Sequence, residues 1–190
     1  MDVKLTTPLT KEKVEGLKPG DNVYITGTIY AARDAAHKKL MERLDEGGPL
    51  PFDPEGAIIY YVGPTPTREG EVIGSAGPTT SVRMDAYTPR LLELGLLGMV
   101  GKGKRGPEVK KKMVETGAVY FAAIGGAGAL IKKTILAQET IAYEELGPEA
   151  IRKLEVKDFP VTVIIDSRGE DLYEQGRAAY LSWKDKEEEK

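Results

Sequence analysis

Apolar residues along the chain follow two spacings, and this mixture predicts both strands and helices. The stretch NVYITGTIY at residues 22–30 is β-branched and aromatic, which predicts a strand. Residues 32–46 come next and consist mainly of helix formers, and Gly47-Gly48 ends the predicted helix. A second apolar run at residues 56–62 predicts a strand that stops at Gly63-Pro64. The first third of the chain therefore has the strand–helix–strand order of an α/β domain.

The remainder of the chain continues this alternation. Residues 79–94 are expected to be helical with a break at Thr88-Pro89, where Thr88 would cap the second piece. Further helices are predicted from Pro107 to Gly117, from Pro148 onward and after the last strand. Further strands are predicted at residues 71–77, 96–100, 118–124, 134–142 and 161–165.

These elements are expected to form a single α/β domain over residues 1–184, followed by a charged, solvated and frayed tail at residues 185–190. The chain has 22 glycines, and many of them stand where predicted strands end. In α/β domains ligands tend to bind at strand ends and helix N-termini, so the candidate chemistry is sought there.

Composition removes several classes of function. The chain has 190 residues and a net charge of −3, which suits a globular domain and argues against a general nucleic-acid binder. It has no cysteine and one histidine, His37, so it cannot supply a thiolate-bound cluster or a multi-histidine metal site. No stretch has the character of a signal peptide or the length of a membrane span, so the cytoplasm is the expected compartment.

The first candidate segment joins the strand at residues 22–30 to the following helix. Arg33 and His37 are four residues apart, so on a helix their side chains share a face. An arginine can hold a carboxylate with two parallel hydrogen bonds, and a histidine can exchange protons near neutral pH. The plainer alternative is that Arg33 pairs with Asp34 or another nearby acid while His37 is a half-buried structural residue. Taken alone, the segment favours that alternative.

The second candidate segment is GPTTSVRMD at residues 77–85. Thr79 and Thr80 stand at the start of a predicted helix, whose first N–H groups attract anions. Arg83 follows about one turn later, so N–H groups, a hydroxyl and a guanidinium could together hold one carboxylate. A threonine N-cap on a surface helix explains the same pattern equally well.

The third candidate segment is the loop GKGKRGP at residues 101–107. Its glycines allow the backbone to approach a ligand closely, and its lysines supply point charges. The spacing nearly matches a P-loop, but Arg105 stands where Ser or Thr should bind Mg²⁺, which disfavours nucleotide binding and leaves a flexible basic turn as the alternative. The run Gly125-Gly126-Ala127-Gly128 lacks a full dinucleotide fingerprint and predicts close backbone packing.

Taken together, TGTIYAARDAAHK (26–38), GPTTSVRMD (77–85) and GKG (101–103) resemble the β subunit, or C-terminal domain, of class I iron–sulfur fumarate hydratases and L-tartrate dehydratases. The likeness extends over nearly the whole chain. It implies a swivelling β/β/α three-layer domain. It also implies a hetero-oligomer with a larger α subunit, whose cysteines hold a [4Fe–4S] cluster. An isolated chain could also form a homo-oligomer through the surface meant for that partner.

The resemblance also implies a reaction and roles for the candidate residues. The family reversibly removes water from a 2-hydroxy dicarboxylate. Thr79 would be the catalytic proton-transfer residue, and it would need activation by its neighbours because free threonine is a poor base. His37 matches a position proposed as catalytic in the tartrate dehydratase pattern, with orientation of Arg33 as the alternative role. Four residues would bind the substrate carboxylates, namely Arg33, Thr80, Arg83 and Lys102.

Two details of the sequence favour fumarate over tartrate as the substrate. The tartrate enzymes tend to have glutamate where Asp85 stands, and they carry extra cysteines where this chain has Ala32 and Ala36. We therefore expect the fumarate–malate reaction, with L-tartrate dehydration as the alternative. A stand-alone anion-binding module and a structural subunit that closes over a partner's site are further alternatives, because likeness of fold does not fix a substrate.

Overall fold

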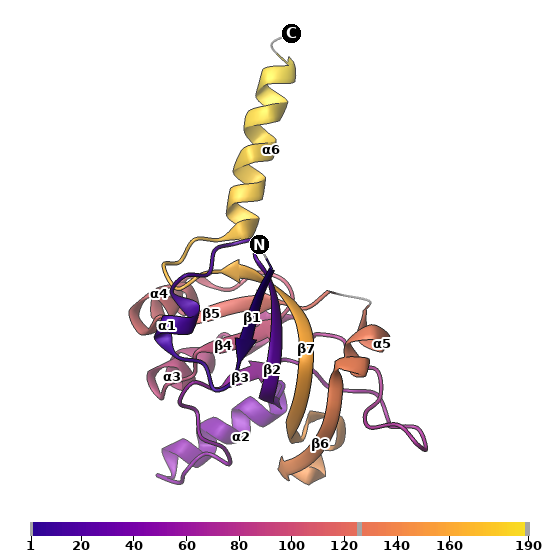
Figure 1. Cartoon of the computed structure of the whole chain (residues 1–190). Helices are drawn as coiled ribbons and strands as arrows, with labels where there is room; N and C mark the ends of the chain where they lie inside the picture. The colour runs from indigo at the N-terminus through magenta and orange to yellow at the C-terminus, as the bar shows by residue number, and fades with distance from the viewer. Residues whose placement is uncertain (1, 125–126, 189–190) are drawn as a thin grey trace.

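One mixed sheet of seven strands organises the chain in the computed structural model, which describes residues 2–124 and 127–188 (Figure 1). In chain order, the strands are β1 (Asp2–Thr6), β2 (Asn22–Ala31), β3 (Ile58–Tyr60), β4 (Gly98–Gly101), β5 (Val119–Ala122), β6 (Ile135–Ala142) and β7 (Ile151–Ile165). Their order across the sheet is β1-β2-β3-β4-β5-β7-β6, and β2 also pairs with β7. This additional pairing closes β2, β3, β4, β5 and β7 into a small barrel-like ring. The predicted α/β class is confirmed.

The strands of the ring differ in direction. Strands β2, β3, β4 and β5 are parallel neighbours, whereas β7 runs antiparallel to β2, β5 and β6. The helices are α1 (Lys11–Val14), α2 (Asp34–Asp45), α3 (Thr88–Glu93), α4 (Pro107–Thr116), α5 (Gly128–Ile131) and α6 (Leu172–Glu188). Three short 3₁₀ helices complete the secondary structure of the described residues, namely η1 (Ser81–Met84), η2 (Lys132–Thr134) and η3 (Glu144–Glu149).

Alternate residues of the central strands face two different cores. Ile58 and Tyr60 belong to the core inside the ring, whereas Ile59 and Tyr61 belong to a second core beneath α2, α3 and α4. All four side chains are fully buried. Burial of one isoleucine contributes roughly 1.5–3 kcal/mol, so a strand covered on both faces needs a continuous apolar sequence. This requirement explains the run at residues 56–62 that predicted the strand.

Helix α4 begins and ends where the sequence predicts. Pro107 takes the first helical position, where its missing N–H group costs no hydrogen bond. Gly117 follows the last turn with a φ of +80°, a conformation that glycine adopts without steric cost, and its amide donates to the carbonyl of Met113. The short loop from β4 therefore ends at Pro107, where α4 begins.

Several predicted elements are wrong. Residues 71–77 form bends instead of a strand, because Ser75 hydrogen-bonds to the hydroxyl and the amide of Thr65. The break near Thr88 is confirmed, but the Thr88 hydroxyl donates back to the Met84 carbonyl at 2.9 Å instead of capping α3. Pro148 lies near the end of η3 and does not open a helix.

The two ends of the chain contain more regular structure than the predicted elements cover. The polar residues 1–20 include β1 and α1, and the run at residues 161–165 is only the end of the long strand β7. Helix α6 projects away from the body of the molecule (Figure 1) and extends to Glu188, within the predicted tail. Residues 125–126 of the glycine run and residues 189–190 of the tail lie outside the described residues. Within the described part of the chain, each helix is too short or too polar to cross a lipid bilayer.

Candidate functional site

Three neighbouring parallel strands end at the same edge of the sheet, and the candidate residues lie there. Arg33 follows β2, and Lys102 follows β4 directly. Strand β3 lies between these two strands and pairs with both. The carboxyl ends of adjacent parallel strands are the usual place for a ligand in α/β folds. Two cationic residues that are far apart in the sequence are thereby brought to one edge.

The segment at residues 77–85 runs back along this edge. The amide of Thr79 donates to the carbonyl of Tyr61, just after β3, at 2.8 Å. Thr80 and Lys102 form a parallel bridge, and the amide of Ser81 donates to the Lys102 carbonyl at 3.0 Å. The two threonines are therefore placed between the ends of β3 and β4. This placement comes from backbone hydrogen bonds that the sequence pattern does not reveal.

The helix that was predicted to start at Thr79 and Thr80 is only a 3₁₀ turn. The segment forms the four-residue 3₁₀ helix η1, and Thr80 precedes it without a side-chain capping bond. A helix of one turn has almost no aligned dipole to attract an anion. Any anion bound here would instead meet side-chain groups, because Thr80, Arg83 and Lys102 are exposed and Thr79 is half-buried.

Arg33 and Arg83 meet at the carboxylate of Asp34. Arg83 makes a short ion pair with one oxygen of Asp34, and the other oxygen lies 3.6 Å from Nε of Arg33. Glu149 approaches the guanidinium of Arg33 at 3.4 Å and accepts a hydrogen bond from the amide of Ala35 at 3.1 Å. The side chain of Arg83 is 50% exposed, so it can reorient towards a ligand at little cost. Arg33 thus pairs with Asp34, as the plainer alternative predicted.

Gly63 makes room for the side chain of Arg33. A Cβ atom at Gly63 would lie 2.9 Å from both Cδ and Nη1 of Arg33. Any larger residue after β3 would therefore displace the Arg33 side chain, because carbon atoms do not approach so closely without strain. The Gly63-Pro64 pair that marked the end of a strand in the sequence also shapes the site.

His37 differs from the other candidates because its side chain is fully buried. Its Nδ1 lies 2.7 Å from the carbonyl oxygen of Arg33, and its ring packs edge-on against Tyr61. Burial lowers the pKa of His37 to about 4, so the ring is neutral at pH 7. Since a carbonyl only accepts hydrogen bonds, Nδ1 carries the proton. This geometry favours the structural alternative, in which His37 holds the turn that bears Arg33, and its catalytic role stays a prediction.

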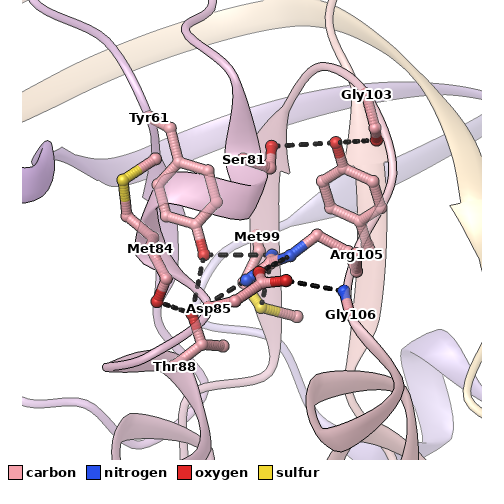
Figure 2. Close-up of polar contacts among 10 residues, drawn as sticks. Tyr61, Ser81, Met84, Asp85, Thr88, Met99, Gly103, Arg105 and Gly106 are labelled. Atoms are coloured by element: carbon pink, nitrogen blue, oxygen red, sulfur yellow. Dashed lines mark hydrogen bonds and ion pairs between the residues drawn. The ribbon is translucent and has the colours of Figure 1, made fainter.

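A buried cation lies below the exposed cluster. Arg105 is hydrogen-bonded to Asp85, Tyr61 and Thr88, and its guanidinium lies over the rings of Tyr61 and Tyr120 (Figure 2). Neither Arg105 nor Asp85 was a candidate in the sequence, where Arg105 appeared only as part of a basic turn. The available signal was weak, because a buried arginine and an exposed arginine in a glycine-rich loop look the same in sequence.

The arrangement is suited to binding an anion with two carboxylates on an open surface. Arg33, Arg83 and Lys102 supply positive charge at this edge, Asp34 and Glu149 offset part of it, and Thr79 and Thr80 add two hydroxyl groups. Charge-assisted hydrogen bonds from arginine are roughly twice as strong as neutral ones. The residues do not fit an iron–sulfur cluster, because the chain has no cysteine thiolate to ligate iron. A cluster acting here would have to be held by another chain.

Comparison with known proteins shows the family of the chain. A family model described as the fumarase C-terminus matches residues 1–176. The chain is 38% identical to "Fumarate hydratase 2" of Leishmania major, with 91% of this chain and 31% of that protein covered. It is 42% identical to "Fumarate hydratase class I, aerobic" of Escherichia coli K12, with 80% of this chain and 28% of that protein covered. The chain thus spans less than a third of either of these relatives.

A second kind of relative has a similar length. The chain is 42% identical to the "Putative L(+)-tartrate dehydratase subunit beta" of Methanocaldococcus jannaschii, with 88% of this chain and 89% of that protein covered. The same type of domain therefore occurs both inside long fumarate hydratases and as a protein named as a separate subunit.

Proposed function

Because the chain belongs to the fumarase C-terminus family, we propose that it is the β subunit of a hydro-lyase that reversibly hydrates fumarate to malate. The observation that supports this proposal is that the ends of β2 and β4 and the segment at residues 77–85 bring Arg33, Lys102 and Arg83 to one edge of the sheet. A substrate with two carboxylates needs two or three such cations. The barrel-like ring with α2, α3 and α4 packed outside it supports the proposed swivelling β/β/α three-layer domain.

The proposed enzyme includes a larger α subunit that carries the cluster. Two observations support this partner: the chain lacks cysteine, and it matches less than a third of the long fumarate hydratases. A [4Fe–4S] cluster in that partner would supply a Lewis acid for the hydroxyl group of the substrate. The exposed side chains of Thr80, Arg83 and Lys102 would face it across the subunit boundary. The complex is proposed to act in the cytoplasm, without nucleic acid or membrane as a partner.

The residues of this chain have two tasks in the proposed reaction. Arg33, Arg83 and Lys102, with the hydroxyl of Thr80, bind the two carboxylates and hold the substrate in one orientation. In the dehydration direction, malate loses a proton from the carbon next to the hydroxyl-bearing carbon, and the hydroxyl leaves as water. Negative charge then develops towards the carboxylate, where fixed cations stabilise it. Thr79 is the proposed proton-transfer residue.

L-Tartrate dehydration is the second candidate reaction. The relative from M. jannaschii supports it, because that protein has nearly the length of this chain and its name refers to tartrate. The cationic cluster recognises carboxylates, which fumarate and tartrate share, so it does not discriminate between the two substrates. Rates of the reconstituted complex with malate and with L-tartrate decide between them.

The proposal is tested by combining this chain anaerobically with the cysteine-bearing α subunit encoded in the same genome. We expect fumarate hydration by the complex and none by this chain alone. Arg83→Ala should raise the KM for fumarate roughly 10- to 100-fold, because a hydrogen bond to a charged group contributes about 1.5–3 kcal/mol. Arg90→Ala is the matched control, since Arg90 forms a surface ion pair with Asp45 on another part of the molecule.

Three results would count against the proposal. Kinetic constants of the Arg83→Ala complex equal to those of the wild type would remove Arg83 from substrate binding. Tight binding of nucleotides instead of dicarboxylates to the isolated chain, measured by calorimetry, would favour the anion-binding module over the enzyme. Unchanged turnover per cluster in all site variants would favour a structural subunit.

A further inference from the structure

Arg105 carries a buried charge and makes none of the substrate contacts proposed above. Its side chain is 0% exposed, so it cannot touch a ligand directly. Its Nε donates to a carboxylate oxygen of Asp85 at 2.7 Å, and Nη2 donates to the hydroxyl of Thr88 at 2.8 Å. Its Nη1 donates to the hydroxyl of Tyr61 at 3.2 Å. One guanidinium thus joins the loop after β4 to the start of α3 and to the end of β3.

Further hydrogen bonds lie beside those of Arg105 (Figure 2). The amide of Gly106 donates to the other carboxylate oxygen of Asp85 at 2.6 Å. The hydroxyl of Tyr120 donates to the carbonyl of Gly103 and pairs with Oγ of Ser81, both at 2.9 Å. In addition to the backbone contacts with Lys102, side chains therefore join the segment at residues 77–85 to the loop at residues 101–107 at two places, Asp85 and Ser81.

These two segments carry most of the proposed substrate contacts. Thr79, Thr80 and Arg83 belong to the first segment, and Lys102 belongs to the second. Asp85 lies two residues after Arg83, and Arg105 lies three residues after Lys102. We infer that Arg105 is a positioning residue that fixes the spacing between the two threonines and Lys102, and the inference rests on the proposed function.

The chemistry of the pair supports a role in geometry more than in stability. A buried ion pair loses much of its Coulomb attraction to desolvation, so its net contribution to stability is often small. A planar guanidinium with five donors, in contrast, can satisfy several acceptors at fixed angles at once. A lysine at the same place would keep the charge but could not bridge Asp85, Thr88 and Tyr61 with the same directions. Arg105→Lys therefore separates charge from geometry.

Hydrogen exchange of the whole chain measures whether Arg105 couples the two segments. The amide of Ser81 reports it directly, because it donates to Lys102 of the other segment, and the amide of Thr79 reports how the segment at residues 77–85 is held against Tyr61. We expect Arg105→Lys to speed exchange at both amides at least tenfold, with the amides that join β2 and β7 unchanged. Arg90→Lys is the matched control and should change neither. If Arg105→Lys does not fold, Tyr120→Phe removes only the second fastening and should act in the same direction.

Kinetics of the complex with the α subunit measure whether this coupling serves the substrate. We expect Arg105→Lys to raise the KM for fumarate at least tenfold at an unchanged melting temperature, whereas a merely structural role would lower the active fraction and leave KM alone. Unchanged KM in a folded variant, or unchanged exchange at both amides, would overturn the inference. An inactive wild-type complex would instead refute the proposed function, and exchange would still decide whether Arg105 joins the segments.

Discussion

Arg33 and His37 are four residues apart, but they differ in burial and in backbone conformation. Four-residue spacing predicted that their side chains share a helix face. Arg33 instead precedes α2 in an extended conformation, with φ −118° and ψ −168°, so the helical spacing does not apply to it. His37 lies on the inner face of α2 with Ala36 and Leu40, and its ring is enclosed. The spacing rule failed because the helix begins at Asp34, two residues later than predicted.

Burial of His37 makes stability depend on pH. Its pKa falls from 6.5 to about 4 on folding, so between these values the unfolded chain binds a proton that the folded chain does not. The free energy of unfolding should therefore decrease by about 3 kcal/mol as the pH drops from 6.5 to 4, and the contribution is fully present above pH 6.5. Urea denaturation between pH 4.5 and 8 measures this dependence.

The control for this prediction is His37→Gln, which keeps a donor for the Arg33 carbonyl and does not titrate. Other groups titrate equally in both proteins, so the difference between the two pH curves isolates His37, the chain's single histidine. Parallel curves for the wild type and the variant would show that the imidazole is accessible to protons in the folded state. That result would support the hypothesis that His37 is catalytic.

At the scale of elements, the sequence predicted the helices and strands more accurately than the segments that connect them. Strands β2 to β5 and helix α4 lie close to where apolar runs, Pro107 and Gly117 predicted them. The errors fall on residues 71–77, where Ser75 is held by hydrogen bonds to Thr65, and on Pro148, which lies inside η3. Local propensity carries no information about such partners.

The end of β4 shows how tightly a connection can be constrained. A Cβ atom at Gly101 would lie 2.0 Å from Oγ of Ser81 and 2.8 Å from a ring carbon of Tyr61. We expect Gly101→Ala to lower the free energy of unfolding by about 1–3 kcal/mol, because an added methyl group in a packed core forces its neighbours apart. Guanidinium denaturation measures the loss.

Gly16→Ala serves as the comparison for Gly101→Ala. No heavy atom of the described structure lies within 4 Å of a Cβ atom built at Gly16, so its free energy of unfolding should change by less than about 0.5 kcal/mol. Equal effects of the two substitutions would mean that backbone entropy, rather than packing against Ser81, dominates at Gly101.

At the scale of the whole molecule, the closed ring forms the body and α6 stands apart from it (Figure 1). Residues 175–184 of α6 are exposed. A chain that ends at Gly176 should therefore unfold within about 2 °C of the full chain, since removing exposed residues costs little. A chain that ends at Asp166 also loses Asp171, which is buried and pairs with Lys110 at 3.1 Å.

The chain that ends at Asp166 should unfold several degrees below the full chain, because about 1 kcal/mol corresponds to 2–4 °C in a domain of this size. Differential scanning calorimetry of the three chains checks both statements. A large loss on ending the chain at Gly176 would show that α6 packs in solution, for example against a second copy of the chain.

The sequence by itself determined the α/β class and the positions of most central strands and of helix α4. It could do so because apolar spacing, β-branched runs, and proline and glycine positions act locally along the chain. It also predicted that Arg33, Arg83 and Lys102 converge, although only through a resemblance of motifs.

The tertiary structure alone decided the closure of the ring, the enclosure of His37 and the network around Arg105. Each of these depends on residues far apart in sequence: β2 pairs with β7, His37 packs against Tyr61, and Arg105 pairs with Asp85. Burial and hydrogen-bond partners are properties of the assembled core, and they set the charge state of a histidine and the role of an arginine. No pattern within one segment specifies them.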